Sequence, residues 1–177
     1  MNPTPLSLTL AILTVITQIF AIKILVVYVF RKRLAHVAPM RWLKKIALPL
    51  AFLIALAGVV GSLIYSNIIG FDPCVLCWWQ RIFLYPLVPI LGVALFRRDH
   101  TNVVRYALPL TVIGAGFSTY HYIIQRFTPH VASCDVMGQS ASCAGFYVFE
   151  FGYITIPLMC LTAFVAIMGL LLFVNKK

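Results

Sequence analysis

Two cysteines three residues apart open the stretch "FDPCVLCWWQRIF". Cys74 and Cys77 have the C-x-x-C spacing that is common in redox-active dithiols. Pro73 precedes them and favours a helix that begins just after it. Both thiols would then lie in the first turn, where free backbone N–H groups and the helix dipole stabilise a thiolate. Arg81 follows Cys77 by four residues and so shares its helix face. The stretch therefore predicts a thiol–disulfide exchange site with a cation beside it.

A second cysteine pair, Cys134 and Cys143, occupies the later stretch "SCDVMGQSASC". The two pairs allow three interpretations: a redox relay, two structural disulfides, or a zinc site of four thiolates. A C-x-x-C disulfide closes a very small loop and removes little chain entropy, so it would stabilise the fold poorly. The spacing of the later pair is loose for a zinc site, and Trp78 replaces the histidine of a c-type haem motif. Redox chemistry is favoured, and no metal is expected.

The elements that position these cysteines are membrane helices. Of the 177 residues, 62% are hydrophobic and 10% are charged, which is far more apolar than a soluble domain. A spanning helix needs about 20 mostly apolar residues. Five stretches qualify: Leu6–Phe30, Ile46–Ile69, Leu76–Phe96, Tyr106–Gln125 and Phe151–Val174. The sequence predicts an all-α integral membrane protein in which Cys160 lies inside the last span.

The charge pattern predicts the orientation of these spans. The net charge is +10, but the basic residues gather at helix ends rather than along a surface for nucleic acid, which we exclude as a partner. Most of the 14 Lys and Arg residues lie between the first two spans, between the third and fourth, or at the C-terminus. The positive-inside rule makes those segments cytoplasmic. The N-terminus and both cysteine pairs are therefore expected outside, where disulfides persist.

The first apolar stretch, Leu6–Phe30, raises the alternative of a cleaved signal peptide. It has no basic segment before it, its apolar run is too long, and "RKR" follows it like a stop-transfer signal. An uncleaved membrane helix is expected.

Two polar residues in the apolar spans have alternative explanations. Burying Arg81 in a membrane costs on the order of 3 kcal/mol, so it either extends to the outer headgroups or faces a partner. The partner would be a thiolate or the oxygen of an electron acceptor. His121, in "STYHYIIQ", lies at about the same depth as Arg81. A lone histidine there is more often an interfacial residue, in a belt with Trp78 and Tyr120.

These motifs together resemble the disulfide bond formation protein B (DsbB) family, and most closely its short branch, the BdbC-type thiol oxidases. The resemblance is carried by "PCVLCWWQRIFLYPL", by "TYHY", by the pair beginning "SCDVMG" and by "GYITIP". It implies a four-helix transmembrane bundle over residues 46–177. Residues 1–45 would then form an extra N-terminal helix and a basic cytoplasmic loop. It also implies a bacterial cytoplasmic membrane.

The resemblance implies a role for each cysteine. Cys134 would belong to the disulfide attacked by a DsbA-like thioredoxin-fold partner, and Cys143 would then link to Cys74. Cys77 would be the thiolate that faces the electron acceptor. The loop between Cys134 and Cys143 is shorter than in longer family members and lacks room for their membrane-surface helix.

The resemblance also implies a cofactor, a membrane quinone such as ubiquinone or menaquinone. Arg81 would hold it near Cys77, and His121 would lie close to it. Membrane lipid is the remaining partner.

Two other functions stay open at this point. A vitamin-K-epoxide-reductase-like enzyme also carries two cysteine pairs in a small bundle, but there the C-x-x-C follows the loop pair, whereas here it comes first. A non-catalytic membrane scaffold with two disulfides would reduce no quinone.

Overall fold

The computed structural model describes residues 5–30, 38–100, 102–127 and 143–174. Within these ranges the chain is helical and forms no β-strand, apart from one antiparallel bridge between Glu150 and Ile154. The elements are α1 (Pro5–Val29), α3 (Ala38–Leu63), the π-helix η1 (Ile64–Ile68), α4 (Val75–Leu84), α5 (Leu87–Arg97), α6 (Asn102–Phe127) and α7 (Ile156–Val174). The predicted all-α fold is confirmed.

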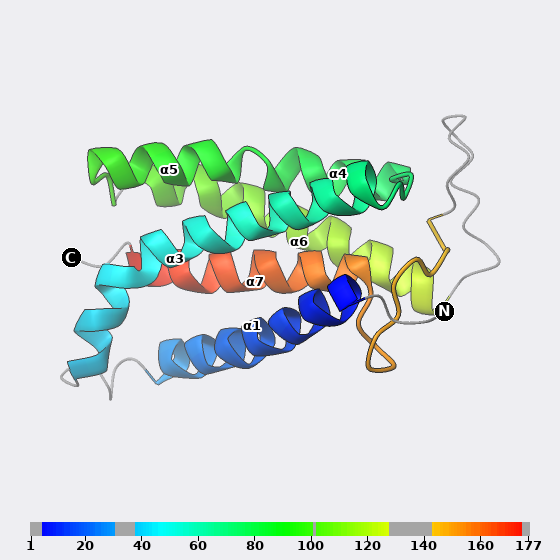
Figure 1. Cartoon of the computed structure of the whole chain (residues 1–177). Coiled ribbons are helices and arrows are strands. Elements are labelled where there is room, and N and C mark those ends of the chain that lie inside the picture. The colour runs from blue at the N-terminus through cyan, green and yellow to red at the C-terminus, as the bar shows by residue number, and fades with distance from the viewer. Residues whose placement is uncertain (1–4, 31–37, 101, 128–142, 175–177) are drawn as a thin grey trace.

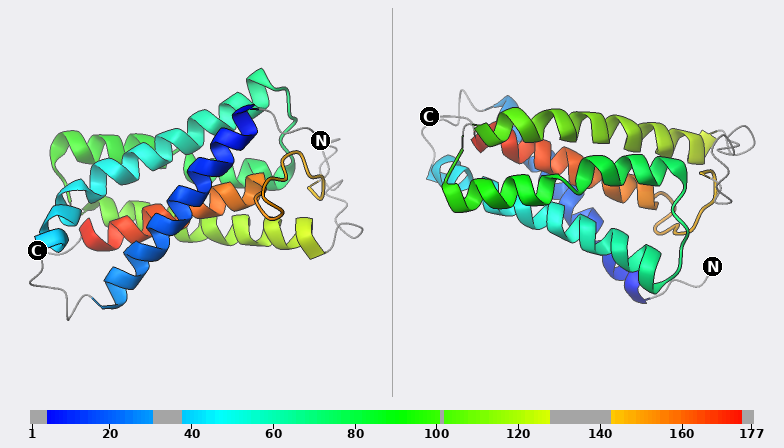
Figure 2. Two further views of the ribbon diagram at one scale, coloured as in Figure 1. Left: turned by 60° about the horizontal axis from the view of Figure 1, so that its bottom comes forward. Right: turned by 90° about the horizontal axis from the view of Figure 1, so that it is seen from above.

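The helices form an elongated bundle around α7. Helices α3, α6 and α1 all pack against α7, while α4 packs on α6 and α5 packs on α3. Figure 1 shows α4 and α5 following one another along the bundle, so that together they match the length of α3 and α6. In the left view of Figure 2, α1 crosses α7 obliquely. The start of α1 and the end of α7 lie at opposite ends of the bundle.

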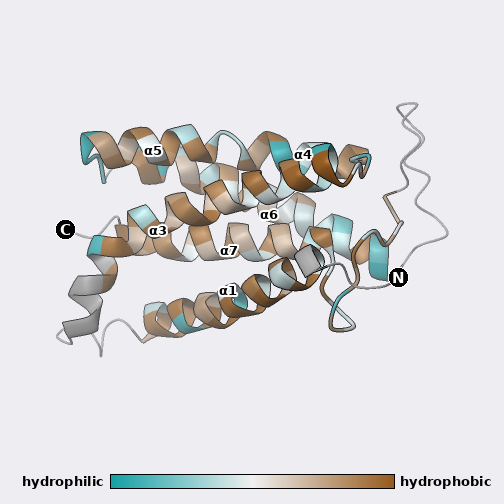
Figure 3. Cartoon of the chain, viewed as in Figure 1, coloured by the Kyte–Doolittle hydropathy of each residue, from teal (hydrophilic) through white to brown (hydrophobic). Residues whose placement is uncertain are grey.

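Four segments of the described chain are long and apolar enough to cross a membrane. They are Ser7–Val29, Lys45–Ile68, Val75–Arg97 and Ile156–Val174. Many exposed residues of these helices are large and apolar, which suits contact with lipid. Figure 3 colours most of the length of these helices as hydrophobic. The remaining predicted span, Tyr106–Gln125, lies within α6, which is as long as α3 at 26 residues but less apolar. Helix α6 buries polar residues inside the bundle, among them His121 and Gln125.

Several helix boundaries differ from the sequence-based expectation. Helix α3 begins at Ala38, within the predicted basic loop and before the span expected from Ile46. The third predicted span is interrupted at Tyr85 and Pro86, where proline lacks the N–H that would continue the α-helical ladder. The last span was expected from Phe151, but α7 begins at Ile156. Phe151 and Gly152 instead adopt positive φ angles of 52° and 76° in a turn closed by the Glu150–Ile154 bridge.

The core between α6 and α7 requires a small residue at Gly114. A Cβ atom at this position would lie 2.3 Å from the ring of Phe164, which is fully buried. Close approach at a small residue is a common way for membrane helices to pack. The contact joins α6, which carries His121, to the central helix α7.

Candidate active site around the dithiol

The first turn of α4 holds both cysteines of the C-x-x-C motif. Cys74 is the N-cap residue, with extended backbone angles (φ −68°, ψ 170°), and its carbonyl accepts a hydrogen bond from Trp78 N at 3.1 Å. The sulfur atoms of Cys74 and Cys77 lie 3.3 Å apart, and both are free thiols. The helix thus begins just after Pro73 and Cys74, as the sequence predicts. Only 2% of Cys74 is exposed.

His121 of α6 contacts Cys74 directly. Its Nε2 lies 3.7 Å from Cys74 Sγ and 3.1 Å from the carbonyl oxygen of Cys143. The amide nitrogen of Gln80 lies 3.0 Å from Nδ1 and donates to it, which leaves the proton of a neutral ring on Nε2. Both Gln80 and His121 are buried. His121 is therefore oriented as a donor toward Cys74 and Cys143.

The segment that begins at Cys143 is held against α6 by its backbone. Gln125, one turn after His121, donates from Nε2 to the carbonyl of Gly145 at 2.7 Å. Cys143 is 1% exposed, is disulfide-bonded and packs in one buried cluster with Cys74 and Leu76. Its predicted relay partner Cys134 lies outside the described residues. The structure therefore brings Cys143 and Cys74 together.

The surroundings of Cys74 favour its thiolate. The hydrogen bond with the Cys77 thiol lowers the pKa of Cys74 well below its usual range, and the hydrogen bond from His121 lowers it further. Burial opposes both effects without cancelling them. A thiolate is the nucleophile and the better leaving group in disulfide exchange, so this placement suits a relay cysteine.

A mostly apolar cavity of about 260 Å³ adjoins the other side of the dithiol. Cys77 and Arg81 reach it from α4, together with Gln80. The remaining walls come from α1, α3, η1, α7 and the connection between η1 and α4, and Cys160 is one of the residues from α7. The cavity is slightly smaller than a typical pocket for a drug-sized ligand. Its position inside the helical bundle suits a compact, lipid-soluble molecule.

Arg81 is held in this cavity by α3. Its Nε donates to Ser62 Oγ at 2.9 Å, and one terminal nitrogen donates to the Ser62 carbonyl at 3.2 Å. The guanidinium carbon also lies 5.3 Å from the centre of the Trp78 ring. These two hydrogen bonds use only part of the five N–H donors of a guanidinium group. Arg81 is thus directed toward α3 and the cavity, and retains donors for a ligand.

Tyr65 adds a second polar group to the cavity. It lies in η1, and π-helical turns are frequent at functional sites. Its hydroxyl is buried and has no hydrogen-bond partner among the described residues. A buried hydroxyl without a partner is costly, so this atom fits a ligand that accepts a hydrogen bond. The ring is stacked on Phe71, with centroids 6.0 Å apart.

His121 lies outside the cavity that contains Arg81. Its expected place close to a bound quinone stays a prediction. His121 lines a separate, much smaller hollow with Cys74, Cys77 and Cys143. The dithiol therefore separates the two groups: His121 and Cys143 lie on one side, and Arg81 lies on the other.

Four polar residues of the site were missed by the sequence reasoning: Ser62, Tyr65, Gln80 and Gln125. Gln80 and Gln125 carry a signal in retrospect, because polar residues inside membrane spans are rare and usually face a partner. Gln125 also follows His121 at the i+4 spacing of one helix face. Ser62 carries no such signal, since a serine hydroxyl can bond its own helix backbone.

The same dithiol has the donor set of a metal site. The ligand atoms of Cys74, Cys77 and His121 all lie within 4.8 Å of one another. Two thiolates and an imidazole suit zinc, with one position left open. No metal was expected from the sequence, and metal analysis of the purified protein would decide this alternative.

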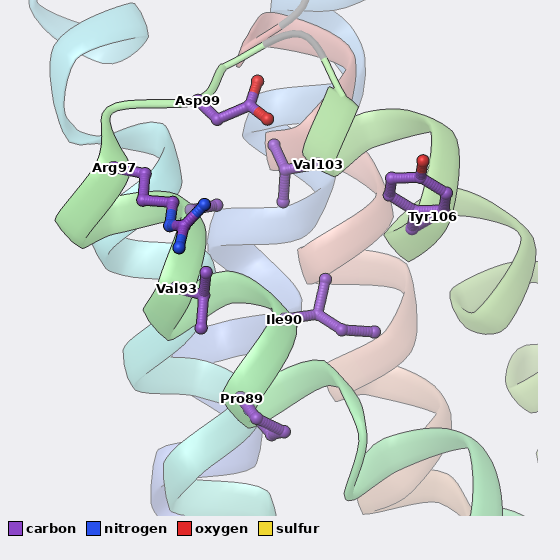
Figure 4. A pocket seen from close by; sticks show the side chains of 8 residues that line it. Pro89, Ile90, Val93, Arg97, Asp99, Val103 and Tyr106 are labelled. Atoms are coloured by element: carbon purple, nitrogen blue, oxygen red, sulfur yellow. The ribbon is translucent and has the colours of Figure 1, made fainter.

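A larger hollow of about 420 Å³ lies between α5 and α6, at the opposite end of the bundle (Figure 4). Its lining includes Arg97, Asp99 and Tyr106 but no cysteine. Asp99 is engaged in capping α6, where its carboxylate accepts from the backbone and side chain of Asn102, both at 3.0 Å. We therefore place the candidate active site at the dithiol.

A membrane helical bundle that holds a dithiol beside a disulfide-bonded cysteine has the features of a thiol–disulfide oxidoreductase. Comparison with known proteins agrees with this class. Residues 44–174 match the model of the family "Disulfide bond formation protein DsbB". The chain belongs to the DsbB family.

Curated relatives support the same assignment. The chain is 44% identical over 117 residues to disulfide bond formation protein C of Bacillus subtilis, which covers 66% of this chain and 83% of the relative. It is 44% identical over 108 residues to a probable disulfide formation protein C 1 of Bacillus anthracis, covering 61% and 76%. A probable disulfide formation protein of Metapseudomonas resinovorans is 39% identical over 130 residues, covering 72% and 88%. No solved structure matches the chain significantly.

The contact between His121 and Cys74 predicts a pH effect. His121→Ala removes a donor from the Cys74 thiolate, so the pKa of Cys74 should rise. The thiolate exists above this pKa and is lost as pH falls through it, so alkylation of reduced Cys74 should fail at a higher pH in the variant. Cys77→Ala should raise the midpoint pH of Cys74 alkylation further, because the hydrogen bond with Cys77 is the largest cause of the lowered pKa of Cys74. The measurement is iodoacetamide labelling against pH, with Cys74 resolved by mass spectrometry.

The matched control is His100→Ala, because His100 is exposed and lies in the connection between α5 and α6. It should leave the midpoint of Cys74 unchanged. An unchanged midpoint in His121→Ala would show that His121 does not stabilise the thiolate.

Proposed function

We propose that this protein is a quinone-dependent thiol oxidase, which reoxidises an extracytoplasmic thioredoxin-fold partner of the DsbA type and passes the electrons to a membrane quinone. The observation that carries the proposal is the position of the dithiol between two different environments. Cys74 adjoins His121 and the Cys143 segment, whereas Cys77 adjoins the cavity that contains Arg81. The names of the relatives, which describe disulfide formation, support the exchange half of this function.

The first half of the proposed reaction is thiol–disulfide exchange with the partner, and it begins at a disulfide between Cys134 and Cys143, the loop disulfide. Cys134 is the proposed partner of Cys143, since the other three cysteines are free. A thiolate of the partner attacks Cys134, the Cys134–Cys143 bond breaks, and the electron pair leaves on Cys143. Cys143 then attacks Cys74 in a Cys74–Cys77 disulfide, and the charge leaves on Cys77.

Two further exchanges complete the transfer. The second thiol of the partner attacks the partner sulfur that is bonded to Cys134. This releases the oxidised partner and frees Cys134. Cys134 attacks Cys143, which restores the loop disulfide and releases Cys74 as a thiolate. His121 donates to this thiolate from Nε2 and so favours its departure. The net result is an oxidised partner and a reduced Cys74–Cys77 pair.

The acceptor half requires a group that takes two electrons and two protons from this dithiol. A bound quinone supplies that chemistry and becomes a quinol. The cavity fits such a group in three respects. It reaches Cys77, and it contains N–H donors of Arg81 and a hydroxyl of Tyr65 that have no partner among the described residues. Arg81 would bind a quinone oxygen and stabilise the negative charge that develops there. Ser62 holds Arg81 in position for this contact.

The proposed location is the bacterial cytoplasmic membrane, with the N-terminus and the active cysteines outside and the C-terminus inside. The dithiol lies near the start of α1, at one end of the bundle. The basic residue Arg97 ends α5 toward the other end of the bundle, and Arg98 is the C-cap of that helix. The positive-inside rule assigns that second end to the cytoplasm.

The direct test is anaerobic quinone reduction by the purified protein with a reduced thioredoxin-fold partner. We expect quinol and oxidised partner to form in equal amounts, because each transfer moves one electron pair. A disulfide-stapled scaffold would form neither product. Partner oxidation without quinol would assign the electrons to a different acceptor.

A further inference from the structure

Helix α1 lies outside the matched family region, residues 44–174, yet it contributes to the candidate acceptor cavity. Four residues of α1 line the cavity: Leu10, Leu13, Thr14 and Thr17. Their spacing is i, i+3, i+4 and i+7, which places them on one face of the helix. Residues on the opposite face, such as Ile12, Ile16 and Ile19, are exposed on the surface that suits lipid.

The position of α1 is fixed by contacts along its length. Gln18 donates to Thr162 of α7 at 3.2 Å and accepts from the hydroxyl of Tyr153 at 3.0 Å. Farther along, Ile24 is 3% exposed and approaches α7 at Gly169, where a Cβ atom would lie 3.0 Å from its side chain. Polar contacts and close packing together make α1 an integral wall of the bundle.

The hydroxyl groups of the two threonines in this wall donate hydrogen bonds to backbone carbonyls of α1 itself. Thr14 donates to the carbonyl of Leu10 at 2.7 Å, and Thr17 donates to that of Leu13 at 2.8 Å. A hydroxyl has a single proton to donate, so neither group retains a donor for a quinone oxygen. The contribution of α1 to the cavity is therefore its shape.

We propose that α1 is a size-selective wall of the acceptor site, and that Thr14 and Thr17 limit the width of the quinone headgroup that can enter. This inference rests on the proposed quinone-dependent function. A side chain enlarged on this face should exclude a two-ring naphthoquinone more strongly than a one-ring benzoquinone.

The test compares quinone affinities of full-length variants by quenching of tryptophan fluorescence, since Trp78 lies against Arg81. Thr17→Phe fills the cavity from α1, and Ile16→Phe places the same ring on the outward face. We expect Thr17→Phe to weaken binding of a naphthoquinone by about tenfold or more and binding of a benzoquinone by less, because misfit groups in pockets cost about that much. Ile16→Phe should bind both as the wild type does. Equal affinities in Thr17→Phe and Ile16→Phe would overturn the proposal.

Thr14→Val separates shape from hydrogen bonding, because it removes the hydroxyl while keeping the volume. We expect this variant to bind both quinones with wild-type affinity. A loss as large as that of Thr17→Phe would assign the role to the hydroxyl and contradict a size limit.

A photoreactive azidoquinone gives a readout that does not depend on activity. Mass spectrometry should find label on the peptide that contains Leu10–Thr17, and excess unlabelled quinone should compete with it. Label confined to other helices would overturn the proposal while leaving quinone reduction intact. Absence of quinone reduction by the wild-type protein would instead refute the proposed function itself.

Discussion

Arg81→Ala should lose quinone reduction by about 100- to 1,000-fold, the range measured when one preorganised donor to a developing oxyanion is removed. Arg81 lines the cavity with Cys77, and Ser62 holds it there through two hydrogen bonds. The exchange site lies on the other side of the dithiol, beside His121. The variant should therefore still react once with a reduced partner, as a stoichiometric burst without continued turnover. The measurement is quinol formation under anaerobic conditions, with partner oxidation followed in parallel.

Arg81→Lys is the matched control for charge. An ammonium group keeps the charge but lacks the planar fork of donors, so we expect only partial recovery. A Cys74→Ala variant, in which Cys77 remains free, should show a visible thiolate–quinone charge-transfer band that disappears on acidification. Wild-type turnover in Arg81→Ala, together with no band in Cys74→Ala, would place the acceptor elsewhere and leave Arg81 without a catalytic role.

The helical architecture could be predicted from the sequence because the bilayer leaves few alternatives. A membrane span must satisfy its backbone internally, so long apolar runs become helices. The start of α4 was equally predictable, since Pro73 and the cysteines set a local helix boundary. The break at Pro86 was missed, although proline removes a backbone donor there. The start of α7 was misplaced because Phe151 and Gly152 form a turn despite their apolar surroundings.

The cysteines of the candidate site could be predicted, but the two sides of the dithiol could not. Depth in the membrane places His121 and Arg81 at a similar level, yet it does not say around which face of α4 each one lies. That depends on helix rotation and packing: His121 reaches Cys74 from α6, and Arg81 turns toward Ser62 of α3. The proposed role of α1 could not be predicted from the sequence either, since Thr14 and Thr17 look like ordinary members of an apolar helix.

The relay order gives the second large effect. Cys143→Ala should trap a mixed disulfide between Cys134 and the oxidised partner, because the Cys134 thiolate attacks the disulfide of the partner, one partner sulfur leaves as a thiolate, and the Cys143 thiol that would release Cys134 is missing. In the wild type, His121 and Gln125 hold the Cys143 segment against α6, and Cys143 packs with Cys74 in one buried cluster. This placement favours Cys143, rather than Cys134, as the cysteine that links to Cys74. The measurement is a non-reducing gel of the variant mixed with oxidised partner, with the linked cysteine identified by mass spectrometry.

Cys134→Ala and Cys160→Ala are the controls for this experiment. Cys134→Ala should abolish partner oxidation without trapping, because the attacked sulfur is absent. Cys160→Ala should trap nothing, since Cys160 is a free thiol of α7 outside the relay. If trapping instead required the loss of Cys74 and ran through Cys77, the partner would attack the dithiol directly. The loop pair would then face the acceptor, and the contact of Arg81 with the cavity beside Cys77 would have no place in electron transfer.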